Sequence, residues 1–232
     1  MLLALREQVY QAHLELVRHG LVVFTFGNVS GCDLEAGLVV IKPSGVPYDQ
    51  LRPDDLVVTD LAGNAVEGKL RPSSDLATHL VLYRSFPGIG GVAHTHSRFA
   101  TAWAQARREI PCLGTTHADY FRGPIPITEP LAADEISGSY EENTGLAIVR
   151  RLRDLDPAQI PGALVAGHGP FCWGPTAAGA AHLAVLVEEI AALAHLTISL
   201  NPGAPDLSEA QRDQHFDRKH GSGAYYGQNT QR

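Results

Sequence analysis

The segment Gly91-Val92-Ala93-His94-Thr95-His96-Ser97 joins an apolar strand pattern to a helical pattern that begins at Ser97 and continues to residue 108. Side chains two residues apart on a strand point to the same face of a sheet. His94 and His96 can therefore converge on one point. The segment predicts a strand that carries two imidazoles to its end, directly before a helix.

Strand and helix patterns alternate on both sides of this segment, and turn residues separate them. Several strands are separated only by turns, which favours a largely antiparallel sheet with helices packed on its faces over a doubly wound parallel sheet. The class is therefore α/β. We expect strands at 38–41, 56–59, 91–95, 125–128 and 163–166, and helices at 2–19, 76–86, 97–108, 143–154, 176–200 and 207–219.

The composition is that of an ordinary folded protein. The chain has 232 residues, of which 44% are hydrophobic and 19% charged, and this excludes wholesale disorder. A net charge of −7 with no long basic run argues against nucleic acid as a partner. The most apolar stretch, 177–200, is interrupted by two glutamates and two histidines, so no membrane partner is expected. No repeat or linker divides the chain, which predicts a single domain over 1–232.

The cysteines and the N-terminus both predict a cytoplasmic protein. Cys32, Cys112 and Cys172 are odd in number, far apart and without a C-x-x-C pair, so they form neither a disulfide framework nor a thiolate zinc site. Residues 1–20 have apolar side chains at helical spacing with charges between them, which indicates an amphipathic helix instead of a signal peptide.

A third imidazole, His168, follows the predicted strand 163–166 and lies between two glycines. Three neutral imidazoles with an open fourth position form the usual catalytic zinc site, and Asp75 could add an oxygen ligand or a hydrogen bond to a ligand. Mn²⁺ and Co²⁺ suit the same donors. The alternative for an isolated His-x-His is a pair of histidines held by hydrogen bonds on a half-buried strand.

Three short segments combine glycine or proline with small hydroxyl or amide residues: 25–30 (TFGNVS), 42–45 (KPSG) and 72–75 (PSSD). Each offers backbone N–H groups and short side-chain donors that suit an anion approached closely. Lys42 adds the positive charge that a phosphate dianion requires in an acidic protein. Turns and helix caps use the same residues, so one such segment alone does not predict an anion site. The three segments together with the metal site favour phosphate binding.

Two further segments carry groups suited to proton transfer. Residues 115–120 (TTHADY) form a polar cluster in which the carboxylate of Asp119 can accept or donate a proton. The tail at 219–227 is rich in aromatic and polar residues, and terminal aromatic side chains usually hold a tail by packing. A tyrosine there works as a base only beside a cation that lowers its pKa.

In this order, the segments at 27–30, 42–45, 72–75, 94–96 and 168–169 resemble the class II aldolase/epimerase family of sugar-phosphate enzymes. Segments 114–121, 167–171 and 219–228 resemble its epimerase branch, and the resemblance extends from about residue 5 to 228. It implies an α/β/α three-layer fold around a largely antiparallel sheet. It also implies a homotetramer with active sites at subunit interfaces, which the C-terminal helix and tail (207–232) reach.

The resemblance assigns roles by motif position. The implied metal ion is Zn²⁺, with Mn²⁺ or Co²⁺ as alternatives, and its implied ligands are His94, His96 and His168, with Asp75 at or near the metal. Asp119 and Tyr226 are the implied acid/base pair, and Tyr226 reaches in from a neighbouring subunit. The implied substrate and phosphate residues are Thr25, Gly27, Asn28, Lys42, Ser44, Gly45, Ser73 and Ser74, and the implied catalytic support comes from Thr115, Glu141 and His215.

The implied activity is a metal-dependent inversion at C4 that interconverts L-ribulose 5-phosphate and D-xylulose 5-phosphate by cleaving and re-forming the C3–C4 bond. The alternative within the family is an aldolase of the fuculose- or rhamnulose-phosphate type. Those aldolases carry a base glutamate where this chain has Asp75, and the shorter side chain favours the epimerase. A thio-sugar phosphate dehydratase would also use a glutamate there, and a non-catalytic domain like the adducin head would lack the metal histidines.

Overall fold

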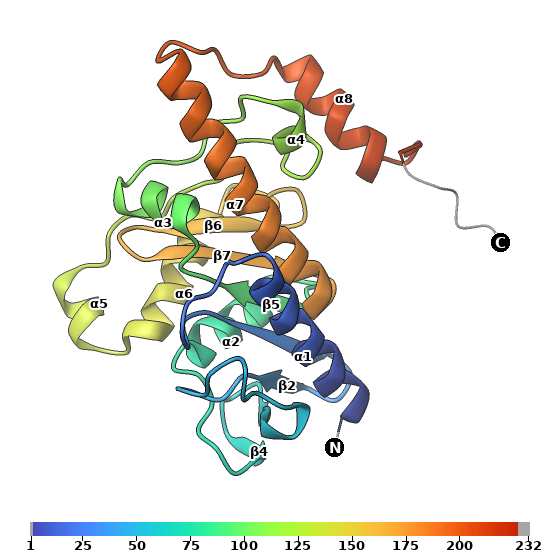
Figure 1. Cartoon of the computed structure of the whole chain (residues 1–232), viewed down its shortest axis with the longest axis vertical. Helices are drawn as coiled ribbons and strands as arrows, with labels where there is room; N and C mark the ends of the chain where they lie inside the picture. The colour runs from blue at the N-terminus through green and yellow to red at the C-terminus, as the bar shows by residue number, and fades with distance from the viewer. Residues whose placement is uncertain (1, 227–232) are drawn as a thin grey trace.

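The computed structural model describes residues 2–226, so residues 227–232 of the predicted tail lie outside the described residues (Figure 1). Seven strands form one sheet in the order β4-β3-β2-β1-β5-β7-β6, and every neighbouring pair is antiparallel. This confirms the predicted class and sheet type. The strands are β1 (Asn28–Asp33), β2 (Leu38–Ile41), β3 (Val57–Asp60), β4 (Ala65–Glu67), β5 (Gly91–His94), β6 (Gly162–Val165) and β7 (Gly169–Gly174).

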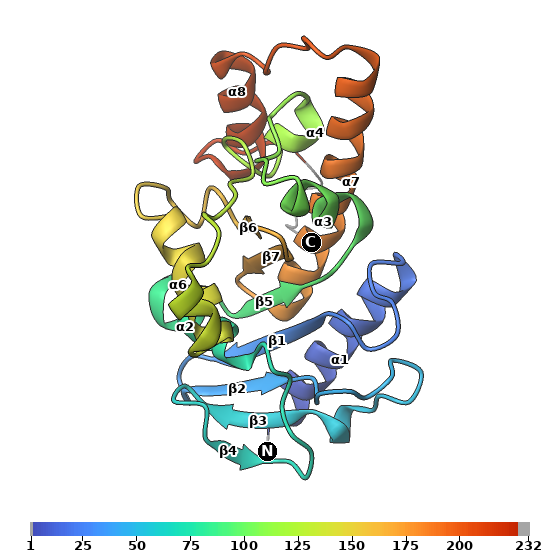
Figure 2. The same ribbon diagram turned by 90° about the vertical axis from the view of Figure 1, so that its left-hand side faces the viewer.

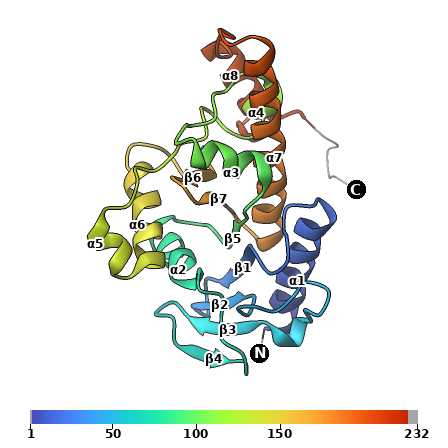
Figure 3. The same cartoon turned by 60° about the vertical axis from the view of Figure 1, so that its left-hand side comes forward.

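Helices cover both faces of the sheet and make three layers (Figures 1 and 3). On one face lie α1 (Leu3–Arg18), α3 (Arg98–Gln105) and α7 (Ala177–Leu200), and on the other lie α2 (Leu76–Ser85) and α6 (Tyr140–Arg151). Strand side chains alternate between the two cores: Cys172 of β7 packs with α1, α3 and α7, whereas its neighbours Phe171 and Trp173 pack with α2 and α6. Shorter helices are η1 (Pro53–Asp55), α4 (Thr115–Ala118) and α5 (Ala133–Ser137), and α8 (Glu209–His220) follows α7.

The predicted strand at 125–128 is wrong. Ile125 and Ile127 form only isolated bridges, to Ile110 and Leu164 respectively. Pro124 and Pro126 lack the N–H groups that a continuous ladder needs, so the apolar run cannot extend into a strand. A second difference is a strand that the sequence does not predict. The segment 25–30 is predicted only as an anion-binding loop, yet from Asn28 onward it forms β1, a central strand paired with β2 and β5.

Helix α7 begins at a side-chain cap, in which Thr176 Oγ1 accepts a hydrogen bond from the N–H of Gly179 at 3.0 Å. Among the described residues it is the one helix whose length and composition would allow it to cross a membrane. It packs against α1, α3, β5 and β7, and the core helices of soluble proteins have the same length and composition.

Helix α8 lies against α4 at the end of the molecule beyond β6, far from β4 (Figures 1 and 2). A side-chain cap begins this helix, because Ser208 Oγ accepts a hydrogen bond from the N–H of Gln211. Just before it, the N–H of Leu207 bonds to the carbonyl of Cys112 at 2.8 Å. This contact fixes where α8 starts, and therefore which of its side chains reach Asp119.

Candidate active site

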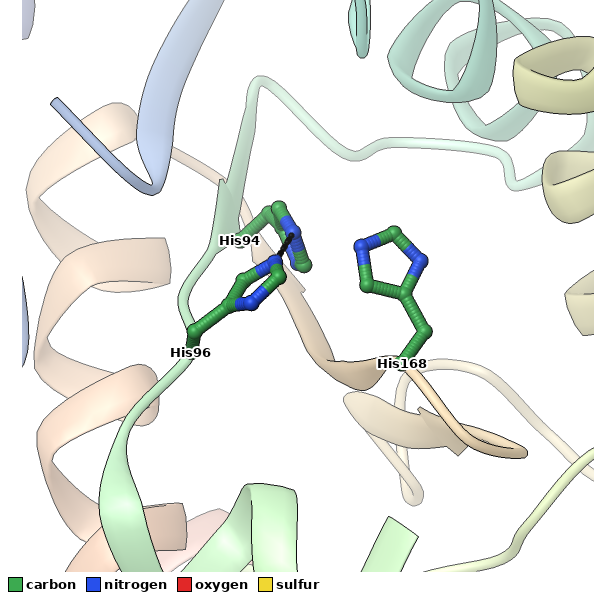
Figure 4. Close-up of side chains that lie close together, drawn as sticks. All are labelled: His94, His96 and His168. Atoms are coloured by element: carbon green, nitrogen blue, oxygen red, sulfur yellow. Dashed lines mark hydrogen bonds between the residues drawn. The ribbon is translucent and has the colours of Figure 1, made fainter. Parts of the chain in front are cut away.

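Three histidines from two parts of the sheet meet at one point (Figure 4). His94 is the last residue of β5, His96 lies two residues beyond it, and His168 lies in the turn between β6 and β7. Because β7 pairs with both β5 and β6, it brings that turn beside the end of β5. One nitrogen from each ring lies within 4.8 Å of the other two, so the predicted triad is brought together.

Neighbouring groups orient two of the rings. Nδ1 of His94 donates to the carbonyl of Pro170 at 2.9 Å, and its ring stacks on Phe171 with centroids 4.1 Å apart. This leaves Nε2 of His94 facing Nε2 of His96 at 3.1 Å. On its outer side His96 stacks on Phe26, with centroids 5.9 Å apart. The backbone carbonyl thus fixes the tautomer that presents a lone pair to the site.

The triad fits a divalent metal ion. Burial lowers the pKa of His94 to about 3 and also lowers the pKa values of His96 and His168, so all three rings are neutral near pH 7. Neutral imidazole is the form that binds metals. In addition, Nδ1 of His168 is buried without a hydrogen-bond partner in the protein. Three nitrogen donors with an open position are typical of catalytic zinc, and they also suit Mn²⁺ and Co²⁺.

Asp75, at the start of α2, belongs to the same site but is not one of the three clustered ligands. Its Oδ2 accepts a hydrogen bond from Nδ2 of Asn28 at 2.6 Å. Burial alone would raise the pKa of Asp75, but the His94 and His79 imidazoles and the Asn28 amide lower it overall. The structure therefore gives Asp75 a hydrogen-bond partner, and direct ligation by Asp75 stays a prediction.

A cavity of about 600 Å³ opens beside the histidines. His96, His168, Asp75 and Glu141 line it together with every residue predicted to bind substrate or phosphate: Thr25, Gly27, Asn28, Lys42, Ser44, Gly45, Ser73 and Ser74. Thr101, Gln105 and Tyr140 also line it and were missed. Thr101 and Gln105 lie four residues apart on a predicted helix, a spacing that places them on one face, whereas nothing in the sequence singled out Tyr140.

Backbone bonds hold two of the predicted anion segments side by side. The N–H of Ser73 bonds to the carbonyl of Lys42 at 2.9 Å, and the N–H of Ser44 bonds to the carbonyl of Arg71 at 3.0 Å. The third segment approaches the metal site directly: Gly27 has φ +80°, and a Cβ there would lie 2.9 Å from the carbonyl oxygen of His94. Only glycine permits both this conformation and this approach.

Lys42 supplies a buried positive charge to this cavity. Its Nζ donates to the carbonyl of Pro43 at 3.3 Å and lies 4.9 Å from the centroid of the Tyr48 ring. Burial lowers the pKa of Lys42 to about 8. The ammonium group therefore remains mostly charged at pH 7, with no carboxylate as its partner among the described residues, and an anion is its natural counter-charge.

The predicted proton-transfer groups form a second cluster. Asp119 directly follows α4, and its carboxylate accepts bonds from Nε and Nη2 of Arg218 at 2.9 and 2.7 Å and from Nδ1 of His215 at 3.0 Å. Lys219 Nζ lies 3.7 Å from the same carboxylate. Partial burial would raise the pKa of Asp119, but Arg218, then His215 and Lys219, lower it overall.

Tyr226 lies against the same two cations of α8, with its ring centroid 4.9 Å from the Arg218 guanidinium and 4.4 Å from Lys219 Nζ. The structure therefore brings Asp119, His215 and Tyr226 together. None of these three, nor Thr115, lines the histidine cavity. Arg218 and Lys219 were also missed, although their positions three and four residues after His215 place all three on one helix face.

The sequence is similar to a known family and to proteins of known name. Residues 7–195 match the family model described as class II aldolase and adducin N-terminal domain. The chain is 54% identical over 224 residues to the L-ribulose-5-phosphate 4-epimerases of Salmonella typhi and Salmonella paratyphi A, covering 97% of this chain and 98% of each relative.

Solved structures share the fold. An L-fuculose 1-phosphate aldolase superimposes with a TM-score of 0.79 at 24% identity, covering 93% of this chain and 95% of that one. The L-fuculose-1-phosphate aldolase from Thermus thermophilus superimposes with a TM-score of 0.69 at 26% identity, covering 88% and 98% of the two chains. The three-layer arrangement is thus common to these proteins.

Proposed function

The chain belongs to the class II aldolase and adducin N-terminal domain family, and we propose that it is an L-ribulose-5-phosphate 4-epimerase. The substrate and product are then L-ribulose 5-phosphate and D-xylulose 5-phosphate, which differ at C4. One observation supports this most directly: a three-histidine cluster and a lysine-containing set of small polar loops line the same cavity. A phosphorylated sugar fits this cavity, because its phosphate suits the lysine-containing loops and its other oxygens can bind a metal at the histidines.

The chemistry of the sugar dictates the route. The C4 proton is not acidic, so C4 is inverted by breaking the C3–C4 bond. A base takes the proton of the C4 hydroxyl, the C3–C4 bonding pair becomes the C2–C3 double bond, and the π pair of the C2 carbonyl moves onto its oxygen. The products are an enediolate of dihydroxyacetone and glycolaldehyde phosphate. The aldehyde then turns its other face, the bond re-forms, and the new C4 oxygen takes a proton from an acid on the opposite side.

The cavity residues divide this work. His94, His96 and His168 would hold a divalent metal, which when bound would supply positive charge beside the sugar oxygens where negative charge develops. Lys42 and the hydroxyls and N–H groups of the loops around Ser44 and Ser73 hold the phosphate while the aldehyde turns. We propose Zn²⁺ as the metal, with Mn²⁺ or Co²⁺ as alternatives, and Asp75 as an additional ligand or as a partner of Asn28.

Asp119 and Tyr226 are the proposed acid/base pair, with Thr115, His215 and Glu141 in support. Because Asp119 and Tyr226 lie outside the cavity of their own chain, we propose that they complete the cavity of a neighbouring chain in a homotetramer. Exposed apolar side chains support such contacts: Phe26, which lines the cavity, and Phe24, whose ring contacts it, are 53% and 80% exposed. Leu196 and Leu200 on α7 are 54% and 89% exposed.

The compartment and domain assignment are also proposals. Cys32, Cys112 and Cys172 are buried free thiols, and burial raises the pKa of Cys32 and Cys112 to about 11. Free, unreactive thiols fit the cytoplasm. One sheet built from residues 28–174, with helices from both ends of the chain packed on it, fits a single domain over 1–232.

A sugar-phosphate aldolase remains the second candidate, because L-fuculose 1-phosphate aldolases share the fold. The decisive experiment follows conversion of L-ribulose 5-phosphate to D-xylulose 5-phosphate with added Zn²⁺, and repeats it with a chelator. Rapid, chelator-sensitive conversion supports the epimerase. Cleavage of L-fuculose 1-phosphate to free aldehyde and ketone, without epimerisation of the pentulose phosphate, would replace it with the aldolase.

A further inference from the structure

Arg218 on α8 contacts both members of the proposed acid/base pair, which are separated by more than a hundred residues along the chain. Its guanidinium donates two bonds to the two carboxylate oxygens of Asp119, at 2.9 and 2.7 Å. The guanidinium carbon also lies over the ring of Tyr226, 4.9 Å from its centroid. A planar guanidinium can make both contacts at once, because its edge donates hydrogen bonds while its face stacks on an aromatic ring.

The backbone of the same residue holds the tail in place. The carbonyl of Arg218 accepts hydrogen bonds from the N–H groups of Tyr225 at 3.0 Å and Tyr226 at 3.1 Å. The chain therefore folds back after α8, and the Tyr226 ring is carried onto the side chain of Arg218. One residue thus fixes both the main chain and the ring of Tyr226 relative to the Asp119 carboxylate.

The charges around the pair are unbalanced. Asp119 faces Arg218, Lys219 and the His215 ring, and its own carbonyl accepts a bond from Nε2 of His220. Tyr226 faces Arg218 and Lys219. Two acids on α8, Asp213 and Asp217, lie instead 3.0 and 3.9 Å from Arg122. Two permanent cations therefore serve one carboxylate, and a second negative charge can be accommodated beside them.

We propose that Arg218 is a positioning residue that joins Asp119 and Tyr226 into one acid/base unit and remains paired with a negative charge as the proton moves between them. This inference rests on the proposed epimerase reaction. The Asp119 carboxylate takes the C4-hydroxyl proton of one epimer, and after the aldehyde has turned, Tyr226 donates its phenolic proton to the new C4 oxygen. The net change moves one proton from Tyr226 to Asp119, and the negative charge moves from carboxylate to phenolate.

Both charged forms contact the same guanidinium. Before the reaction its edge pairs with the Asp119 carboxylate, and afterwards its face and Lys219 lie against the Tyr226 phenolate. No cation has to be brought in or released during turnover. To restore the starting state, Asp119 gives its proton to water and the Tyr226 phenolate takes one from water.

The test compares Arg218→Met with Arg218→Lys in kcat/KM against pH, on enzyme loaded with Zn²⁺. Methionine removes the cation that lowers the pKa of Asp119, so we expect the acid limb of the profile to move to higher pH and kcat to fall by about 10- to 100-fold. Lysine keeps the charge but not the two-point contact, so its acid limb should lie between those of Arg218→Met and the wild type, with kcat still reduced.

Arg122→Met is the matched control. Arg122 also pairs with a carboxylate of α8, Asp213 at 3.0 Å, and also lies over an aromatic ring, Phe216 at 5.8 Å. It touches neither Asp119 nor Tyr226, so its variant should keep the wild-type profile. If Arg218→Met keeps the wild-type kcat and acid limb, or if Arg122→Met shifts the limb as far, the inference is wrong. If Arg218→Met does not fold, the same comparison applies to Arg218→Lys.

Failure of the proposed epimerase function can be distinguished from failure of the Arg218 inference. If the wild-type protein does not epimerise L-ribulose 5-phosphate, the proposed function is wrong. The contact can still be measured by urea unfolding of Asp119→Asn, Arg218→Met and the double variant. A joined pair predicts non-additive shifts in the unfolding midpoint, whereas Asp119→Asn combined with Arg122→Met should be additive. Additive shifts for Asp119 and Arg218 would overturn the pairing whatever the substrate.

Discussion

The Nε2 atoms of His94 and His96 face each other at 3.1 Å, and the other nitrogen of His94 is committed to the carbonyl of Pro170. A neutral His94 therefore presents only a lone pair to His96. Without a metal, His96 must donate its proton across this gap. A divalent cation would replace that single hydrogen bond with bonds to both rings and to His168, which accounts for three imidazoles gathered here without a carboxylate among them.

Removing one ring of this triad should remove the metal. We expect His96→Ala, purified by gel filtration and measured by elemental analysis, to lose most of its bound metal, because two nitrogen donors hold a divalent ion far less tightly than three. Epimerisation should be lost with it. His195→Ala, which changes a histidine on α7 outside the triad, should retain the metal. Full metal occupancy in His96→Ala would contradict the ligand assignment.

The acid/base pair should be essential to turnover but not to folding. We expect Tyr226→Phe and Asp119→Asn each to lower kcat by roughly 10²- to 10⁴-fold, the usual contribution of a positioned acid or base. Metal content should stay at the wild-type level, because neither residue belongs to the histidine cluster. Steady-state assays and circular dichroism of each variant check this, and wild-type rates in both variants would refute the assignment.

Hybrid tetramers can establish whether the pair serves a neighbouring cavity. His96→Ala and Tyr226→Phe are each expected to be inactive, but co-expressed chains would form some sites with an intact cavity from one subunit and an intact tyrosine from another. Random mixing should restore roughly a quarter of the wild-type activity per site. A mixture of His96→Ala with His168→Ala, both in the cavity, should stay inactive. No recovery in the first mixture would mean that each chain acts alone.

The lowered pKa of Lys42 predicts that kcat/KM falls at high pH. Its folded pKa of about 8 lies below the ordinary lysine value of 10.5, so the cation is present below pH 8 and is lost as pH rises through that value. We expect kcat/KM to fall above about pH 8, whereas kcat falls less, because a bound phosphate dianion favours the charged lysine. Lys42→Met should raise KM by about tenfold or more and abolish this limb. Lys69→Met, on an exposed loop, is the control, and an unchanged basic limb in Lys42→Met would exclude the lysine as its source.

Much of the fold could be predicted because its core elements follow simple periodicities. The α2 and α7 patterns and the β2 run show their spacing directly in the sequence. The central strand β1 could not be recognised, because Asn28, Ser30 and Gly31 are not strand-forming residues and are stabilised only by tertiary contacts. Ser30 bonds to His79 and Tyr83 at 2.7 Å, and the Leu5 and Val9 side chains fill the space beside Gly31.

The site was predicted where several ligands lie close together in the sequence and missed where they do not. His94 and His96 identify a strand end by themselves, and the loops at 42–45 and 72–75 carry recognisable anion-binding residues. Tyr140 enters the cavity from the first turn of α6, and nothing in its local sequence indicates this. Arg218 acquires its role only when α8 docks on α4, a contact between segments about a hundred residues apart.

The match to the family model ends at residue 195, so every residue of the histidine cavity lies inside it, whereas α8 and Tyr226 lie beyond it. Of the proposed acid/base pair, Asp119 is therefore encoded together with the cavity, whereas Tyr226 and the helix that positions it are encoded beyond it. A duplicated copy could change the residues after 195 and alter the fate of the cleaved sugar, released or rejoined with opposite handedness, while inheriting the metal and phosphate cavity intact. Stereochemical outcome in such a lineage can evolve at the end of the chain.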